Sequence, residues 1–113
     1  MLHIHLICIG KIKEQYLKDA IQEYTKRLSK YCSLTITELP DEQIPNNLNT
    51  KLAEMIKETE SNRILSHIKP NQYVFCLDLH GKSYSSEEFS RKIENISLTN
   101  GNITFIIGGS LGM

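Results

Sequence analysis

The chain has 113 residues, of which 40% are apolar and 23% are charged, and its formal net charge is zero. Length and composition are typical of one globular domain with its own core, so we expect residues 1–113 to form a single α/β domain. A neutral total gives no indication of a nucleic-acid or acidic-membrane partner, and the apolar run at residues 2–9 is too short to span a membrane.

The first third of the chain predicts a strand, a helix and a second strand. Residues 2–9 are an apolar strand pattern that Gly10 ends. A helix follows, because apolar residues recur at three- and four-residue steps and form one stripe. A second strand at residues 34–39 is rich in β-branched residues and is ended by Pro40. The helical stripe consists of Leu17, Ala20, Ile21, Tyr24, Leu28 and Tyr31.

The middle of the chain predicts a loop, a helix and a buried strand. Residues 41–49 contain Pro45 and several asparagines, which is typical of a loop. Residues 50–69 predict a helix whose apolar stripe is interrupted between Thr59 and Arg63, so we expect it to be partly exposed and to end because of Pro70. Residues 73–79 are almost continuously apolar, as a strand covered on both faces requires.

The last third begins with a capping box. The Ser85 hydroxyl can accept the Glu88 N–H while the Glu88 carboxylate reaches back. An apolar helix face follows, and residues 100–102 turn the chain into a final buried strand at residues 103–107. That strand leads into Gly108, Gly109, Ser110, Leu111 and Gly112.

The element order is therefore βαβαβαβ with short connections. This alternation predicts a parallel sheet with right-handed crossovers and helices on both faces. Ligands of such sheets bind beyond the carboxyl ends of the strands. We expect those ends at residues 10–11, 39–40, 80–82 and 108–110.

The glycine-rich turn at residues 108–112 is the first candidate site. It matches neither the dinucleotide fingerprint nor a phosphate-binding loop. A tight turn that needs positive φ would explain the glycines without any ligand. Because the turn follows a fully apolar strand, close approach of its backbone to a cofactor is an equally supported interpretation.

A second candidate follows the strand predicted at residues 73–79. Asp78, His80, Gly81 and Lys82 place a carboxylate, an imidazole and an ammonium group within five residues. The alternative is that Asp78 only closes the end of the strand while Lys82 is solvated. If this strand and the last one are neighbours, both glycine turns border one crevice.

Other polar residues carry weaker signals. His3 and His5 alternate on one strand face without a ligand partner nearby, which favours partly exposed histidines over metal ligands. Glu38 could bind a ribose hydroxyl, but Gly10 lacks the further glycines of a dinucleotide fingerprint. The first helix is mildly basic, which suits either a phosphate-facing surface or, more commonly, a solvated helix face.

The cysteines indicate a compartment rather than a site. Cys8, Cys32 and Cys76 are odd in number and widely spaced, with no CxxC pair, so we expect no metal site. Cys8 and Cys76 fall inside apolar strand patterns, where a free thiol behaves as a small hydrophobic group. Unpaired cysteines and the absence of a signal peptide favour the cytoplasm.

The chain resembles the SPOUT-class bacterial methyltransferases that modify a pseudouridine of large-subunit ribosomal RNA. The resemblance runs in register through the whole chain, and its last two stretches together are specific. The matching stretches are residues 9–14, 20–28, 39–42, 63–65, 68–70, 77–86 and 105–112.

The resemblance implies an α/β fold whose C-terminal part forms a deep trefoil knot, a known exception to the rule against knots. It also implies S-adenosylmethionine as cofactor, a homodimer, and methylation of N3 of the pseudouridine on assembled ribosomes. Carried over by position, Leu77 contacts the cofactor from the end of its strand, and Gly108 with Gly109 does so from the glycine turn.

Members of that family continue beyond the glycine turn with a helix, a strand and a helix that form the knot. Because the 113 residues stop before that segment, we expect this chain alone to be inactive, and we assign no catalytic residue within it. Two alternatives remain: a non-catalytic module that binds ribosomal RNA through its basic first helix, and a fragment of a nucleotide-binding oxidoreductase. The missing fingerprint glycines disfavour the second.

Overall fold

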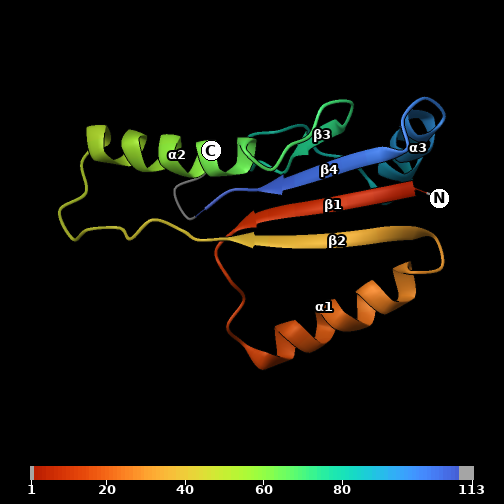
Figure 1. Cartoon of the computed structure of the whole chain (residues 1–113), viewed down its shortest axis with the longest axis horizontal. Helices are drawn as coiled ribbons and strands as arrows, with labels where there is room; N and C mark the ends of the chain where they lie inside the picture. The colour runs from red at the N-terminus through yellow and green to blue at the C-terminus, as the bar shows by residue number, and fades with distance from the viewer. Residues whose placement is uncertain (1, 110–113) are drawn as a thin grey trace.

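The structure is a computed structural model that describes residues 2–109, and its four strands form one parallel sheet in the order β2-β1-β4-β3 (Figure 1). The predicted βαβαβαβ order and the parallel sheet are confirmed. Ser110, Leu111 and Gly112 of the glycine-rich segment lie outside the described residues. The elements are β1 (Leu2–Ile9), α1 (Gln15–Leu28), β2 (Cys32–Leu39), α2 (Thr50–Leu65), β3 (Tyr73–Cys76), α3 (Ser86–Ser97) and β4 (Asn102–Ile107).

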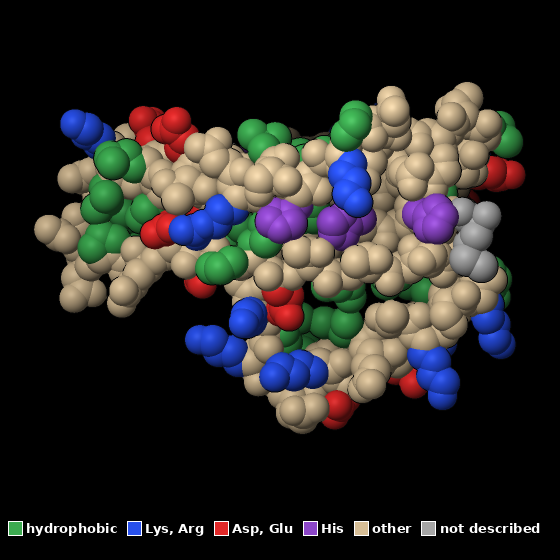
Figure 2. All heavy atoms as spheres, in the orientation of Figure 1, with side chains coloured by type: hydrophobic (Ala, Val, Ile, Leu, Met, Phe, Trp, Pro, Cys, Tyr) green, Lys and Arg blue, Asp and Glu red, His purple; other side chains and the backbone are tan. Residues whose placement is uncertain are grey.

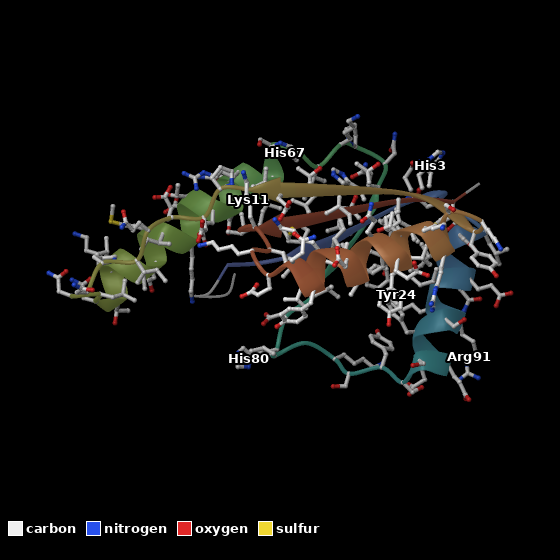
Figure 3. The ribbon with its side chains drawn as sticks, turned by 90° about the horizontal axis from the view of Figure 1, so that it is seen from below. His3, Lys11, Tyr24, His67, His80 and Arg91 are labelled. Carbon is white, nitrogen blue, oxygen red and sulfur yellow. The ribbon has the colours of Figure 1, made fainter. Side chains whose placement is uncertain are left out.

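Helices lie on both faces of the sheet. Ile106 of β4 belongs to the same buried cluster as Ile64 of α2, whereas its neighbour Phe105 contacts Phe89 of α3. Because consecutive strand residues point to opposite faces, α2 and α3 cover opposite faces of the sheet. Figure 3 shows α1 on the same side of the sheet as α3, as right-handed crossovers require.

The core lies under α2, on the two central strands. Ile7 of β1 is fully buried, and it packs with Leu39, Ile64 and Ile106, each no more than 6% exposed. Fully burying side chains of this size contributes about 1.5–3 kcal/mol each. The central strands β1 and β4 therefore organise the fold. No helix within residues 2–109 combines the length and hydropathy needed to cross a membrane.

The boundaries of the first two helices differ from the predicted ones. α1 ends at Leu28, and Tyr31 lies in the turn before β2 with 76% of its surface exposed. α2 ends at Leu65, before Pro70 can act. There the Ser66 hydroxyl donates to the Arg63 carbonyl at 2.7 Å, and His67 Nδ1 lies 2.9 Å from the same oxygen. Such side-chain partners satisfy a carbonyl that the end of the helix leaves without an intrahelical donor.

The prediction of a strand over residues 73–79 buried on both faces was wrong. β3 ends at Cys76 and is an edge strand, paired with β4 alone among the described strands. Leu77 is 49% exposed and Leu79 is fully exposed. The expectation that Cys76 is a buried hydrophobic group fails for the same reason, since an edge strand leaves it exposed, whereas Cys8 is half-buried.

The start of α3 matches its prediction. The Ser85 hydroxyl accepts the Glu88 N–H at 3.1 Å, and the Glu88 carboxylate accepts the Ser85 N–H, which completes the capping box. The helix then places Phe89 against the stacked rings of Phe75 and Phe105, whose centroids are 5.2 Å apart. This aromatic cluster is the main contact between α3 and the sheet.

Candidate functional site at the carboxyl edge of the sheet

The ends of β3 and β4 lie side by side. Cys76 pairs with Ile106, and the Leu77 N–H donates to the Ile106 carbonyl at 2.9 Å. Neighbouring strands lie about 4.8 Å apart, so the residues that follow them border the same stretch of the edge. The structure therefore brings Leu77 and Gly108 together, which is the arrangement that the crevice hypothesis required.

Gly109 is explained by close packing rather than by its backbone angle. Its φ lies outside the left-handed region, so the positive-φ interpretation is wrong for this residue. A Cβ atom added to Gly109 would lie 2.6 Å from Oε1 of Glu60, closer than real Cβ atoms approach. A side chain at this position would therefore require the Glu60 carboxylate to move.

Glu60 is a buried carboxylate that the sequence interpretation missed. It is 5% exposed, and its Oε2 accepts the Glu42 N–H at 2.9 Å. Its Oε1 has no hydrogen-bond partner among residues 2–109. One helical turn separates it from Ile56 and from Ile64, which are both buried. The sequence does contain a signal for this burial. Within the apparent interruption of the α2 stripe, Glu60 lies four residues from Ile56 and four from Ile64, which is the spacing of one helix face.

Arg63 of α2 holds the loop that follows β2. Its Nη1 donates to the Pro40 carbonyl at 2.8 Å, and its Nη2 forms an ion pair with Glu42. Both side chains of the pair are about one-third exposed. The sequence interpretation did not single out Arg63 or Glu42 either. Together with Glu60, these residues connect α2 to the end of β2 and to the glycine turn.

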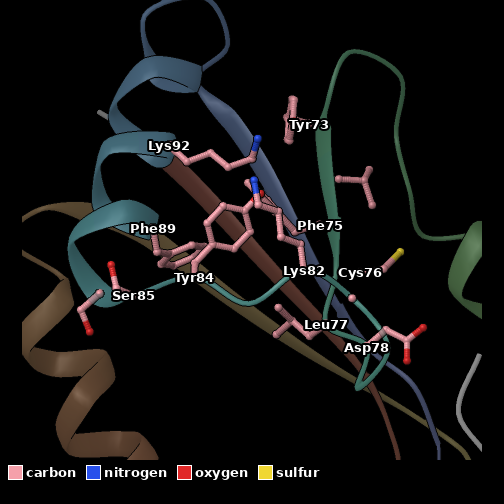
Figure 4. A pocket seen from close by; sticks show the side chains of 13 residues that line it. Tyr73, Phe75, Cys76, Leu77, Asp78, Lys82, Tyr84, Ser85, Phe89 and Lys92 are labelled. Atoms are coloured by element: carbon pink, nitrogen blue, oxygen red, sulfur yellow. The ribbon is translucent and has the colours of Figure 1, made fainter.

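A pocket of about 600 Å³ lies beside β3, on the face that α3 covers (Figure 4). Two lysines lie over its aromatic rings: Lys82 Nζ is 5.3 Å from the Tyr84 ring centre, and Lys92 Nζ is 6.0 Å from that of Phe75. Leu77 is part of its lining, but Gly108 and Gly109 are not. The pocket thus includes one of the two candidate cofactor segments and leaves out the glycine turn.

The Asp78 to Lys82 segment forms a turn, and Asp78, Gly81 and Lys82 belong to the lining of this pocket. Asp78 Oδ1 accepts the His80 N–H at 3.2 Å, and the Asp78 carbonyl accepts the Gly81 N–H at 3.0 Å. The imidazole of His80 and the Lys82 side chain lie at the surface. The structure supports the interpretation that Asp78 closes the end of the strand.

The remaining polar candidates have structural partners. Glu38 Oε2 accepts the Ile12 N–H at 3.1 Å, so its carboxylate holds the loop after β1. His3 is exposed and His5 half-buried, as predicted. His5 Nε2 lies 2.7 Å from the Thr37 hydroxyl, and burial, with the nearby His67 and Lys69, lowers the pKa of His5. His3 and His5 both lie in the first half of β1, away from the carboxyl edge. Figure 2 shows that histidine side chains are exposed on one face of the molecule.

The comparisons with known proteins agree with this architecture. A family model described as "Predicted SPOUT methyltransferase" matches residues 2–113. Two relatives named "Ribosomal RNA large subunit methyltransferase H", from Clostridium botulinum (strain 657 / Type Ba4) and Clostridium beijerinckii, are 58% and 54% identical over 113 residues. Each comparison covers 99% of this chain and 71% of the relative. The chain therefore belongs to the SPOUT methyltransferase family.

Proposed function

We propose that this chain acts in the transfer of a methyl group from S-adenosylmethionine to large-subunit ribosomal RNA, at N3 of a pseudouridine in assembled ribosomes. Family membership supports methyl transfer, and the printed names of the relatives support ribosomal RNA as the substrate. The structural observation that carries the proposal is the pairing of β3 with β4, which places the two candidate cofactor segments at one edge.

We assign the donor site to Leu77, Gly108 and Gly109. Leu77 presents a half-exposed apolar side chain at the end of its strand, suited to the face of a purine ring. Gly108 and Gly109 have no side chains that would keep a ligand away from backbone N–H and C=O groups. The residues present thus fit a nucleoside that lies along the strand ends.

The bound donor supplies a sulfonium methyl group that a ring nitrogen can attack. The chain's own contribution is to hold this group in a fixed orientation, and orientation of reactants lowers reaction barriers by up to about 7–11 kcal/mol in favourable cases. The rigid β1 and β4 strands under α2 suit that task, since their core residues are almost fully buried. We assign no catalytic base within residues 2–109.

A second copy of the chain and a cytoplasmic ribosome complete the proposal. β3 is an edge strand, and α1 has no buried residue although it carries Leu17, Tyr24 and Leu28. Exposed apolar side chains and an edge strand are features that a homodimer interface would cover. The expected location follows from the substrate, because assembled ribosomes are cytoplasmic.

One observation favours the alternative of a non-catalytic RNA-binding module. α1 has no buried residue, and it carries Lys26 and Arg27 in its last turn, with Lys30 just beyond. A basic and fully accessible helix end is suited to phosphate contacts.

Nuclear magnetic resonance titration with S-adenosylmethionine tests the donor site, because amide shifts report even weak binding. We expect the largest shifts at Leu77, Gly108 and Gly109. Gly101, in the turn at the opposite end of β4, is the internal control and should not shift. The proposal fails if millimolar donor leaves the three amides unchanged, or if the shifts gather at Gly101 instead.

A parallel RNA titration separates the two functions. The alternative module predicts RNA binding that weakens steeply with salt and is lost in the triple variant Lys26→Ala, Arg27→Ala and Lys30→Ala, with no response to the methyl donor. Donor-dependent shifts that survive in the triple variant favour the methyltransferase.

A further inference from the structure

We propose that Glu60 is a positioning residue of the donor site, whose buried carboxylate supports the turn at Gly108 and Gly109 from the α2 side. The proposal rests on the function proposed above and concerns a residue beneath the site, not one that contacts the reacting atoms. Three observations carry it: the burial of the carboxylate, its contact with Gly109, and its link to the loop after β2.

The first observation is burial without a complete set of partners. Glu60 is 5% exposed, and a carboxylate removed from water requires hydrogen-bond donors for both oxygens. The Glu42 N–H satisfies Oε2, while Oε1 has no partner within the described residues. Ile56 and Ile64 are buried on the same helix face, which directs the Glu60 side chain toward the interior.

The second observation is the direction of the free oxygen. The Cβ position of Gly109 lies 2.6 Å from Oε1, and 3.1 Å from both Cδ and Oε2, so the carboxylate group occupies the space that a side chain would need. Backbone N–H groups of a glycine turn are donors that such an acceptor can reach without an intervening side chain. Oε1 therefore faces this turn, although no backbone N–H of the described residues donates to it.

The third observation is that Glu60 connects two strand ends. Through the Glu42 N–H it holds the loop after β2, and Arg63 holds the same loop through Pro40 and Glu42. β2 and β4 lie on either side of β1 in the sheet. One face of α2 thus fixes both loops, so a shift of the Glu60 carboxylate is transmitted to the glycine turn.

The test replaces Glu60 by glutamine, which keeps the size of the side chain and one acceptor for the Glu42 N–H. Glu58→Gln, an exposed change on the same helix, is the matched control. We expect amide hydrogen exchange at Gly108 and Gly109 to become about tenfold faster in Glu60→Gln, since the buried charge that packs against Gly109 is lost and the turn opens more readily. Affinity for S-adenosylmethionine should fall by about the same factor, and Glu58→Gln should match the unmodified chain in both.

A double-mutant cycle tests the contact itself. Gly109→Ala places a methyl group against Oε1, and we expect it to weaken donor binding and to accelerate exchange at Gly108. Glu60→Asp withdraws the carboxylate by one methylene group, so Gly109→Ala should weaken donor binding less in that background. A combined variant that binds more tightly than Gly109→Ala alone demonstrates the coupling.

The outcomes separate this proposal from the one on which it rests. If the unmodified chain binds no donor, the proposed function fails, while the exchange rates still decide whether Glu60 supports the turn. Equal exchange in Glu60→Gln and Glu58→Gln overturns the positioning role. If Glu60→Gln does not fold, the double-mutant cycle tests the positioning role instead. Strictly additive effects of Gly109→Ala and Glu60→Asp would then show that the two residues are not coupled.

Discussion

The two faces of the sheet differ in a way that the helix patterns do not suggest. α2 has an interrupted apolar stripe, yet it buries Ile56, Glu60 and Ile64. α1 and α3 have regular stripes, yet neither contains a buried residue. The regularity of a stripe therefore indicates which side of a helix faces the sheet, but the depth of burial depends on which strands lie beneath it.

The position of each helix over the sheet explains the difference. α2 packs on β1 and β4, the two central strands, which contain the nearly inaccessible Ile7 and Ile106. α1 packs against β2, one edge of the sheet, and α3 packs on β3 and β4 near the other edge. The side that is tightly packed is also the side that supports the glycine turn, because Glu60 lies on it.

The largest expected difference concerns the core. Ile64→Ala should lower the free energy of unfolding by about 2–5 kcal/mol, because it opens a cavity beside Ile7 and Ile106. Leu17→Ala on α1, where the side chain is 39% exposed, should cost less than about 1 kcal/mol. Urea denaturation measures both. Equal losses would show that the two faces are packed alike.

The ion pairs of the two regions give a smaller contrast. Arg63→Ala removes both the Glu42 pair and the hydrogen bond to the Pro40 carbonyl, and we expect a loss of about 1–2 kcal/mol. Arg27→Ala removes only the exposed pair with Glu23 on α1, for which about 0–0.5 kcal/mol is expected. Thermal unfolding at low and high salt checks this, and a larger loss in Arg27→Ala would contradict it.

The smallest expected effect is the pH dependence of stability through His5. Its pKa is lowered in the folded chain by burial and by the neighbouring His67 and Lys69. The unfolded chain therefore binds a proton more readily, so stability should fall as the pH drops below about 6.5. His5→Gln should reduce this fall, with His3→Gln as the exposed control in the same strand. A fall of unchanged size in His5→Gln would assign the effect to other groups.

Much of the fold could be predicted because it depends on local patterns. The strand at residues 2–9, the capping box at Ser85 and Glu88, and the parallel order follow from alternation, hydrogen-bonding side chains and crossover chirality. Residues 73–79 could not be predicted correctly, because an apolar run looks alike in a central strand and in a strand at the edge of the described sheet.

The site was predictable only in part. Gly108 follows from the predicted end of the last strand, whereas Leu77 was named through the family resemblance. Their adjacency depends on strand order, which the pattern left open. Glu60 was missed because a charged residue in an apolar stripe is ordinarily taken as a break in the stripe. Its burial becomes apparent only when Gly109, nearly fifty residues later in the chain, is brought against it.

A crystal structure of the chain with S-adenosylhomocysteine tests the central claim most directly. We expect the nucleoside between Leu77 and Gly108, with the Glu60 carboxylate in contact with Gly109 behind it. A nucleoside bound in the aromatic pocket beside Tyr84 and Lys92, with no contact to the glycine turn, would contradict it.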